Sequence, residues 1–140
     1  MIQQCNPDDH KFLYHIDIKS FEWPWQLDAW KQINEYFIQA FYIKDVPRGY
    51  HIFQIGRSSL EVSKLCVNPI FRRIGLGSAL LRDLVRHAIR LQKTKLCMTV
   101  HEDCQYFGWL ANRRWKATGI IKAVYPDGTD GFLFEREVIS

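Results

Sequence analysis

The sequence has no C-x-x-C pair, no internal repeat, no low-complexity tract and no apolar run long enough to cross a bilayer. A membrane-spanning helix needs about 18 or more consecutive apolar residues, so no membrane partner is expected. The N-terminus has neither a basic patch nor an apolar segment, which argues against a signal peptide and makes the cytoplasm the expected compartment. No segment has the composition of a linker, so residues 1–140 are predicted to form a single domain.

Cysteine is scarce and irregularly spaced, at Cys5, Cys66, Cys97 and Cys104. None of the spacings matches a metal or redox motif, so neither a metal site nor a disulfide framework is predicted. Cys66 and Cys97 lie in apolar, strand-like runs, where a reduced cysteine behaves as a small hydrophobe. Both are therefore predicted to be structural.

Charge is not in large excess, because the net charge is only +4. Basic residues nevertheless crowd into one stretch, at Arg72, Arg73, Arg82, Arg86, Arg90, Lys93 and Lys95. Either they form a solvated helix face, which is usual for such a run, or they balance the charge of a phosphate-rich ligand. No helix-turn-helix or base-stacking motif accompanies them, so nucleic acid is not an expected partner.

The chain is 47% hydrophobic and 14% aromatic, and its apolar residues follow helix and strand periods in turn. Helical spacing and capping residues predict helices over 7–19, 26–36, 75–91 and 104–112. The first of these helices is predicted to have Asn6 as its N-cap and Pro7 in its first turn. β-branched and aromatic runs predict strands over 38–44, 50–55, 60–67, 95–101, 115–125 and 132–138, with a turn at 46–49. This order predicts an α/β protein with a mixed sheet and helices on both faces.

Two of these helices have faces that the sequence distinguishes. In the first helix, Phe12, Leu13 and Ile16 are predicted to be buried. In the helix over 75–91 the apolar face is predicted to be Leu76, Leu80, Leu81, Leu84, Val85, Ala88 and Ile89. The solvated face of that helix is predicted to be Arg82, Asp83, Arg86 and Arg90.

The segment from Arg72 to Gly77 joins a predicted strand to the most periodic helix. The first amides of a helix have no partner within it, and the helix dipole adds partial positive charge there. Glycines at 75 and 77 allow close approach of an anion, and Ser78 and two arginines add donors. The alternative is an ordinary tight turn, but the strand–loop–helix context favours a pyrophosphate site. The segment fits neither the phosphate-loop nor the dinucleotide fingerprint, since Leu80 stands at the latter's third glycine.

The stretch from Val67 to Leu81, VNPIFRRIGLGSALL, resembles motif A of the GNAT N-acetyltransferases, whose signature is [RQ]-x-x-G-x-[GA]. Arg72, Gly75 and Gly77 stand at the signature positions. The resemblance implies a GNAT fold, a mostly antiparallel mixed sheet of about six to seven strands that splays between 60–67 and 95–101. It also implies acetyl-coenzyme A as cofactor, held by Leu65, Cys66, Val67, Arg72, Arg73, Ile74, Gly75, Leu76, Gly77, Ser78, Ala79 and, at the family's asparagine position, Cys104.

Within this family the chain most resembles RimI-like ribosomal-protein-alanine N-acetyltransferases. The loop Phe21-Glu22-Trp23-Pro24-Trp25 is similar to an F-x-x-P-W loop that faces the peptide in those enzymes. Val124-Tyr125-Pro126 with Asp130-Gly131 is similar to their Y-Y-P…D-G loop. The resemblance therefore implies acceptor contacts at Phe21, Trp23, Trp25 and Tyr125.

Acetyl transfer to an amine needs a proton acceptor, and the family often places a carboxylate on the strand where Glu61 stands. A solvent-facing edge glutamate is the alternative interpretation. His101 shares a strand face with Thr99, where a family glutamate or histidine is missing, and is a second candidate base.

In this family a tyrosine usually protonates the leaving thiolate. This chain has Leu110 at the position of that tyrosine. Tyr106 and Tyr125 are the candidate replacements, and departure of the thiolate without an acid is the alternative.

The prediction is an N-acetyltransferase acting on a protein N-terminal α-amine or a small amine, with a catalytically weak module that binds coenzyme A or a protein as the alternative. Monomer and homodimer both stay open.

Overall fold

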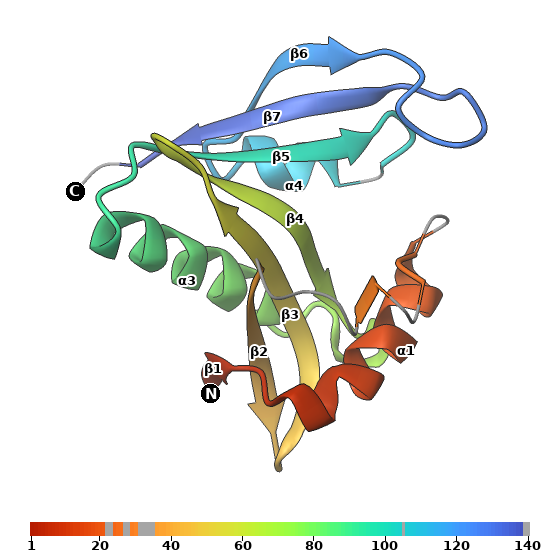
Figure 1. Ribbon diagram of the computed structural model, residues 1–140, viewed down its shortest axis with the longest axis vertical. Coiled ribbons are helices and arrows are strands. Elements are labelled where there is room, and N and C mark those ends of the chain that lie inside the picture. Colours follow the sequence, from red (N-terminus) through yellow and green to blue (C-terminus); the bar gives the residue numbers. More distant parts are fainter. Residues whose placement is uncertain (22–23, 27–28, 31–35, 105, 139–140) are drawn as a thin grey trace. The chain divides into compact units, whose positions relative to one another are not determined.

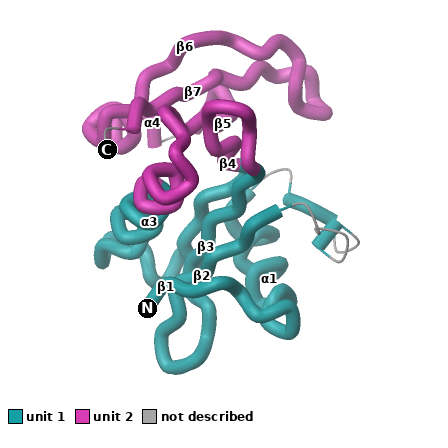
Figure 2. The backbone as a smooth tube through the Cα atoms, turned by 60° about the vertical axis from the view of Figure 1, so that its left-hand side comes forward, with its two compact units in different colours: residues 1–54, 63–84 teal, residues 55–62, 85–140 magenta. Residues whose placement is uncertain are grey.

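The computed structural model describes residues 1–21, 24–26, 29–30, 36–104 and 106–138. The chain divides into two compact units, residues 1–54 with 63–84 and residues 55–62 with 85–140 (Figure 2). In the described ranges, no helix is both long and apolar enough to cross a membrane.

Seven strands are hydrogen-bonded in the order β1-β2-β3-β4-β5-β7-β6 (Figure 1). They are β1 (Ile2–Gln4), β2 (Phe37–Ile43), β3 (Val46–Ile55), β4 (Ser59–Val67), β5 (Lys95–His101), β6 (Lys116–Ile121) and β7 (Gly131–Glu137). The pairs β1–β2, β2–β3, β5–β7 and β7–β6 are antiparallel. β4 and β5 are parallel, and their register runs only from Ser59↔Lys95 to Val62↔Met98. The mixed, mostly antiparallel sheet is confirmed, and the short strand β1 is an addition to the prediction.

The N-terminal helix begins where its capping residues predict. The Asn6 side chain accepts from the Asp8 amide at 3.0 Å and Pro7 opens the first turn, which is the 3-10 helix η1 (Pro7–Asp9). Helix α1 (His10–Ser20) continues from it. Leu13 and Ile16 are buried as predicted, whereas Phe12 is 37% exposed and Asp17 is fully buried in its place.

The first unit has its own apolar core. This core contains Cys5, Leu13, Ile16, Trp30, Ile38, Ala40, Tyr50, Ile52 and Cys66. The predicted helix over 26–36 lies mostly outside the described residues, although Ala29 and Trp30 are helical.

All four cysteines are free, and Cys66 and Cys97 are buried, as predicted for structural thiols.

The turn between β2 and β3 is not at 46–49 as predicted. It is formed by Lys44 and Asp45, whose φ angles are 51° and 66°, a two-residue connection of the kind that suits the twist of a hairpin. Pro47 lies in β3 opposite Tyr42, beside a register shift that accommodates a residue without an amide hydrogen. Gly49 also lies in β3. A Cβ at this position would come within 3.2 Å of the Cys66 carbonyl oxygen on β4, which explains why the residue is glycine.

The second unit has a β6–β7 hairpin and the short helix α4 (Phe107–Ala111), which is shorter than the predicted 104–112. The Phe107 ring lies 5.5 Å from both the Phe132 and the Phe134 rings of β7. Buried side chains in this unit include Leu60, Leu96, Val100, Leu110, Trp115 and Phe134.

Helix α3 (Leu76–Arg90) confirms the strongest helix prediction, with two changes to its faces. Asp83 was predicted to be solvated but is only 8% exposed, and its Oδ2 lies 2.8 Å from Nε2 of the fully buried His51. Ile89 was predicted to be buried but is 40% exposed. A buried hydrogen-bond partner on β3 explains the first difference, and no helical period reveals such a partner.

Candidate functional site

The loop between β4 and α3 has the backbone that an anion site requires. After Val67 the chain enters the 3-10 helix η2 (Pro69–Phe71), capped by the Asn68 side chain, which accepts from the Ile70 amide at 3.1 Å. Arg73 and Gly75 both have left-handed backbone conformations, with φ of 66° and 91°. Helix α3 then begins at Leu76. Two reversals of the backbone within three residues thus lead directly into a helix N-terminus.

The Arg72 side chain is bonded to its own chain. Its Nε donates to the Val67 carbonyl at 3.0 Å, and its NH2 donates to the Ser20 hydroxyl at 3.1 Å. These two bonds fasten the loop to the end of β4 and to the last residue of α1. Arg73, by contrast, is exposed and adds charge at the loop surface.

The loop residues fit a pyrophosphate. The amides of Leu76 and Gly77 are in the first helical turn, where no intrahelical acceptor exists. Gly75 is exposed, and a Cβ built on it would meet no atom within 4 Å, so an anion can approach the backbone there. Ser78 and Ala79 follow in the same turn, and the exposed side chain of Ile74 precedes it. The predicted cofactor residues on β4 differ in burial, since Cys66 is buried while Leu65 and Val67 are half-buried.

Phe21 and Trp25, which follow α1, contact a group that the sequence analysis does not identify. Of the predicted acceptor residues, Trp23 lies outside the described residues, while Phe21 and Trp25 are half-buried against the core of the first unit. Both rings contact the ammonium of Lys64 on β4. Lys64 alternates with Val62 and Cys66 on the buried face of the strand, and a lysine on an apolar face is the signal that could have identified it.

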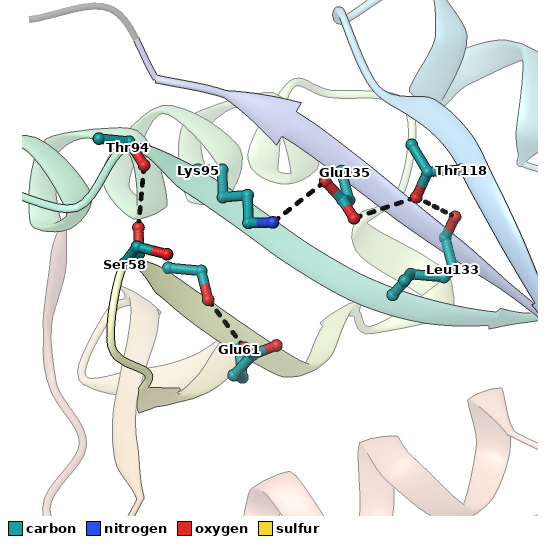
Figure 3. Close-up of polar contacts among 8 residues, drawn as sticks. Ser58, Glu61, Thr94, Lys95, Thr118, Leu133 and Glu135 are labelled. Carbon is teal, nitrogen blue, oxygen red and sulfur yellow. Dashed lines mark hydrogen bonds and ion pairs between the residues drawn. The ribbon is translucent and has the colours of Figure 1, made fainter.

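In the second unit, Glu61 lies on a polar row that crosses three strands. It is opposite Cys97 on β5, which is opposite Glu135 on β7, so the three side chains share one face. Glu61 is exposed and accepts from the Ser59 hydroxyl at 2.7 Å. Figure 3 shows this bond beside the neighbouring network, in which Glu135 accepts from Lys95 at 3.4 Å and from Thr118 at 3.1 Å.

The thiol at the centre of this row is not a nucleophile. Burial raises the pKa of Cys97, and the charge of Glu61 raises it further, while the Ser59 hydroxyl acts in the opposite direction. The thiol therefore stays protonated at neutral pH. Of the two carboxylates in this row, Glu135 is paired with Lys95 at 3.4 Å, whereas Glu61 accepts from the Ser59 hydroxyl.

His101 lies at the far end of β5 and has different partners. Its Nε2 is 2.8 Å from the Thr129 hydroxyl, and its ring is 4.5 Å from that of Tyr125. It lies four positions after Cys97, which is about 13 Å along a strand. The two candidate bases, Glu61 and His101, therefore lie in different parts of the second unit.

The candidate proton donors cluster near His101. The Tyr106 amide donates to Cys104 Sγ at 3.4 Å, and Cys104 also raises the pKa of Tyr125, for which burial is the larger cause. Tyr106 is 42% exposed, whereas Leu110, at the family's tyrosine position, is 3% exposed. Burial also raises the pKa of the Cys104 thiol. The structure thus brings His101, Cys104, Tyr106 and Tyr125 into one region of the second unit.

A comparison with protein families decides the assignment that the loop suggests. The model of the Acetyltransferase (GNAT) family matches residues 8–107. The chain belongs to the GNAT acetyltransferase family. This family uses acetyl-coenzyme A, so the prediction of this cofactor is confirmed. Among curated proteins, no sequence matches this GNAT chain.

Solved structures share its fold at low sequence identity. Ard1 from Thermoplasma volcanium is 18% identical with a TM-score of 0.89, covering 100% of this chain and 98% of that chain. The ribosomal-protein-S18-alanine N-acetyltransferase from Escherichia coli is 20% identical with a TM-score of 0.87, covering 100% and 94%. The PaiA N-acetyltransferase from Thermoplasma acidophilum, in complex with coenzyme A, is 15% identical with a TM-score of 0.78, covering 98% of both chains. The predicted GNAT fold and its RimI-like resemblance are confirmed at the level of structure.

Proposed function

We propose that residues 1–140 act as one GNAT domain that transfers acetyl from acetyl-coenzyme A to an amine. The observation that carries this proposal is the loop from Arg72 to Ser78, whose left-handed Arg73 and Gly75 lead into the N-terminus of α3. Helix N-terminal amides and the exposed Arg73 are suited to a pyrophosphate. Arg72 holds this loop in place through its hydrogen bonds to the Val67 carbonyl and the Ser20 hydroxyl.

Glu61 is the proposed proton acceptor. When bound, the cofactor supplies an activated acetyl group as a thioester. The acceptor amine must be neutral to attack it, and an exposed carboxylate can accept the proton directly or through water. The Ser59 hydroxyl donates to Glu61 Oε1 at 2.7 Å, and this hydrogen bond orients the carboxylate. The backbone of Leu65, Cys66 and Val67 is proposed to pair with the pantetheine arm of the cofactor along β4, and Cys104 to lie where the family has asparagine.

The acceptor is proposed to be the α-amine of a protein N-terminus, with a small amine as the alternative. Two observations support a peptide. The rings of Phe21 and Trp25 are half-buried on the surface segment after α1, and Tyr125 lies in a loop closed by hydrogen bonds. In addition, a structure with the same fold is a ribosomal-protein-S18-alanine N-acetyltransferase.

The test is acetyl transfer by the intact chain. The protein is incubated with acetyl-coenzyme A and each of two panels, peptides with free N-termini and small amines, and the released thiol is measured. Mass spectrometry then locates the acetyl group. We expect thiol release with peptides and acetylation of the α-amine. Release of no thiol with either panel would refute the proposed activity, and turnover of small amines alone would replace the acceptor.

A binding module without turnover is the second candidate, favoured by one observation. Leu110 stands at the family's tyrosine position and is 3% exposed, and a leucine side chain has no proton to donate. Isothermal titration calorimetry separates the candidates. Tight binding of coenzyme A together with absent turnover would support the module.

A further inference from the structure

Lys64 on β4 is a buried cation in contact with two aromatic rings. The residue is 7% exposed, although lysine is almost never buried unless it is paired. Its Nζ lies 4.4 Å from the centre of the Phe21 ring and 5.2 Å from that of the Trp25 ring. An ammonium held against the face of an aromatic ring is attracted by the ring's electrons, and the attraction grows when water is excluded.

Asp17 on α1 completes the attachment. Its Oδ1 lies 2.9 Å from the Lys64 ammonium and accepts from the Tyr50 hydroxyl at 2.6 Å. Its Oδ2 accepts from the Trp25 backbone amide at 2.7 Å. Burial raises the pKa of Tyr50 well above its ordinary range, so this hydroxyl stays a donor. One carboxylate thus ties together a strand lysine, a core tyrosine and the backbone of the aromatic segment.

This arrangement is more elaborate than core packing requires. A methionine at position 64 would fill a similar volume without a buried charge, and replacing a buried ion pair by apolar groups is often neutral for stability. The ion pair does one thing that an apolar side chain cannot do. Its two charged groups contact both rings and the Trp25 amide, and these contacts depend on charge.

We propose that Lys64 is a positioning residue for the acceptor, acting through Phe21 and Trp25. The inference rests on the proposed function, in which these two rings contact the acceptor peptide. It deepens that function by assigning acceptor affinity, as opposed to cofactor affinity or the chemical step, to a buried lysine. The acceptor it implies is a peptide whose first residues pack against flat aromatic surfaces.

The first experiment compares steady-state kinetics of a double variant with those of a matched control. Lys64→Met is combined with Asp17→Asn, because Lys64→Met alone leaves a buried, unpaired carboxylate. The control is Lys11→Met, which removes an exposed lysine that also lies over an aromatic ring, 5.3 Å from the centre of Phe12. We expect the double variant to raise the KM for the peptide about tenfold, as for loss of a desolvated cation–ring contact, with kcat and coenzyme A affinity within about twofold. Lys64→Arg, which keeps the cation, should recover part of the loss, and Lys11→Met should change nothing.

Two kinetic results would overturn the proposal. One is an unchanged KM for the peptide in a folded double variant. The other is an equal loss in KM, kcat and coenzyme A affinity, which would mean that the pair only stabilises the fold.

The second experiment does not depend on activity and so separates the failure of this inference from the failure of the proposed function. Amide hydrogen exchange of Trp25 is measured in wild type, Lys64→Met and the double variant, with Ile52 of the core as internal reference. We expect Trp25 to exchange at least about tenfold faster in both variants while Ile52 keeps its protection. Unchanged exchange at Trp25 would refute the positioning role, even if the wild-type chain acetylates no peptide.

Discussion

His101 donates a hydrogen bond from Nε2 to the hydroxyl of Thr129, at 2.8 Å. The direction follows from the next bond, because Thr129 has one hydroxyl proton and gives it to Asp127 Oδ1 at 2.6 Å. With the ring proton on Nε2, Nδ1 is the acceptor, and it accepts from the Asp103 amide at 3.0 Å. Both ring nitrogens are thus engaged, so His101 holds the loop over 125–130 and is poorly placed to take a proton from an amine.

Replacement of His101 by glutamine should therefore have a small kinetic effect. His101→Gln keeps an N–H donor within reach of Thr129, and we expect kcat/KM to fall less than about tenfold, whereas loss of a general base costs about a hundredfold or more. Steady-state kinetics across pH checks this. A hundredfold fall in kcat together with loss of the acidic limb of the pH profile would restore His101 as the base.

Replacement of Glu61 should have the large effect. We expect Glu61→Gln to lower kcat by about 10²- to 10⁴-fold and to leave coenzyme A affinity unchanged. It should also lower the pKa of Cys97, because the charge of Glu61 contributes to raising that pKa. The control is Glu135→Gln on the same sheet face, whose carboxylate is already bonded to Lys95 and Thr118. Equal losses in both variants would contradict the assignment of Glu61 as base.

An alanine at position 75 should damage the cofactor loop through its backbone. Gly75 has φ of 91° and no atom within 4 Å of an added Cβ, so the cost comes from conformation and not from a clash. We expect Gly75→Ala to lower the free energy of unfolding by about 1 kcal/mol. As the loop relaxes, the affinity for coenzyme A should fall by about tenfold or more. Thermal denaturation and calorimetry measure the two effects.

Gly108→Ala is the matched control for this variant. Gly108 also has no atom within 4 Å of an added Cβ, but it lies in helix α4 and has no left-handed φ. Alanine there should be neutral or stabilising by about 0.5–1 kcal/mol, with no change in coenzyme A affinity. If Gly75→Ala binds coenzyme A as well as this control does, the loop backbone is not the cofactor site.

Acid should loosen the loop over 122–130. Hydrogen bonds from the Ala123 amide and from Lys122 lower the pKa of Asp130 below its ordinary 3.8, and bonds from Thr129 lower that of Asp127. Because the folded pKa values are lowered, this contribution to stability is complete above the ordinary value and is lost as pH falls through the folded values. An NMR titration of the Ala123 amide should report the change below about pH 4, and Asp130→Asn should remove it. A midpoint above 3.8 would show that the charge of Asp130 does not stabilise the loop.

Elements with a strong local signal were predicted closely from the sequence. Helix α3, the strand over 95–101 and the N-cap at Asn6 match because period, β-propensity and capping are properties of adjacent residues. The hairpin turn was misplaced because Pro47 and Gly49 are usual turn residues. Their positions in β3 depend on a register shift and on the approach of β4, which are tertiary facts.

The part of the candidate site that could be predicted from the sequence is the cofactor loop, which is expected to bind through its backbone amides. The cofactor loop has a family signature, so its residues were identified by position. Lys64 and Asp17 carry no such signature, and their pairing joins a helix to a strand 47 positions away along the chain. Likewise, the engagement of His101 depends on Thr129, which no pattern around residue 101 reveals.

The inward direction of Arg72 has a consequence for tracing how this protein and its relatives diverge. The bonds from Arg72 to Val67 and Ser20 hold the loop to β4 and α1 whether or not the loop binds a cofactor. A descendant that had given up catalysis would lose stability by replacing Arg72, and selection for folding alone would retain it. Retention of the signature arginine in a relative therefore indicates that the fold is kept. Retention of the carboxylate at position 61 is the better indicator that the chemistry is kept.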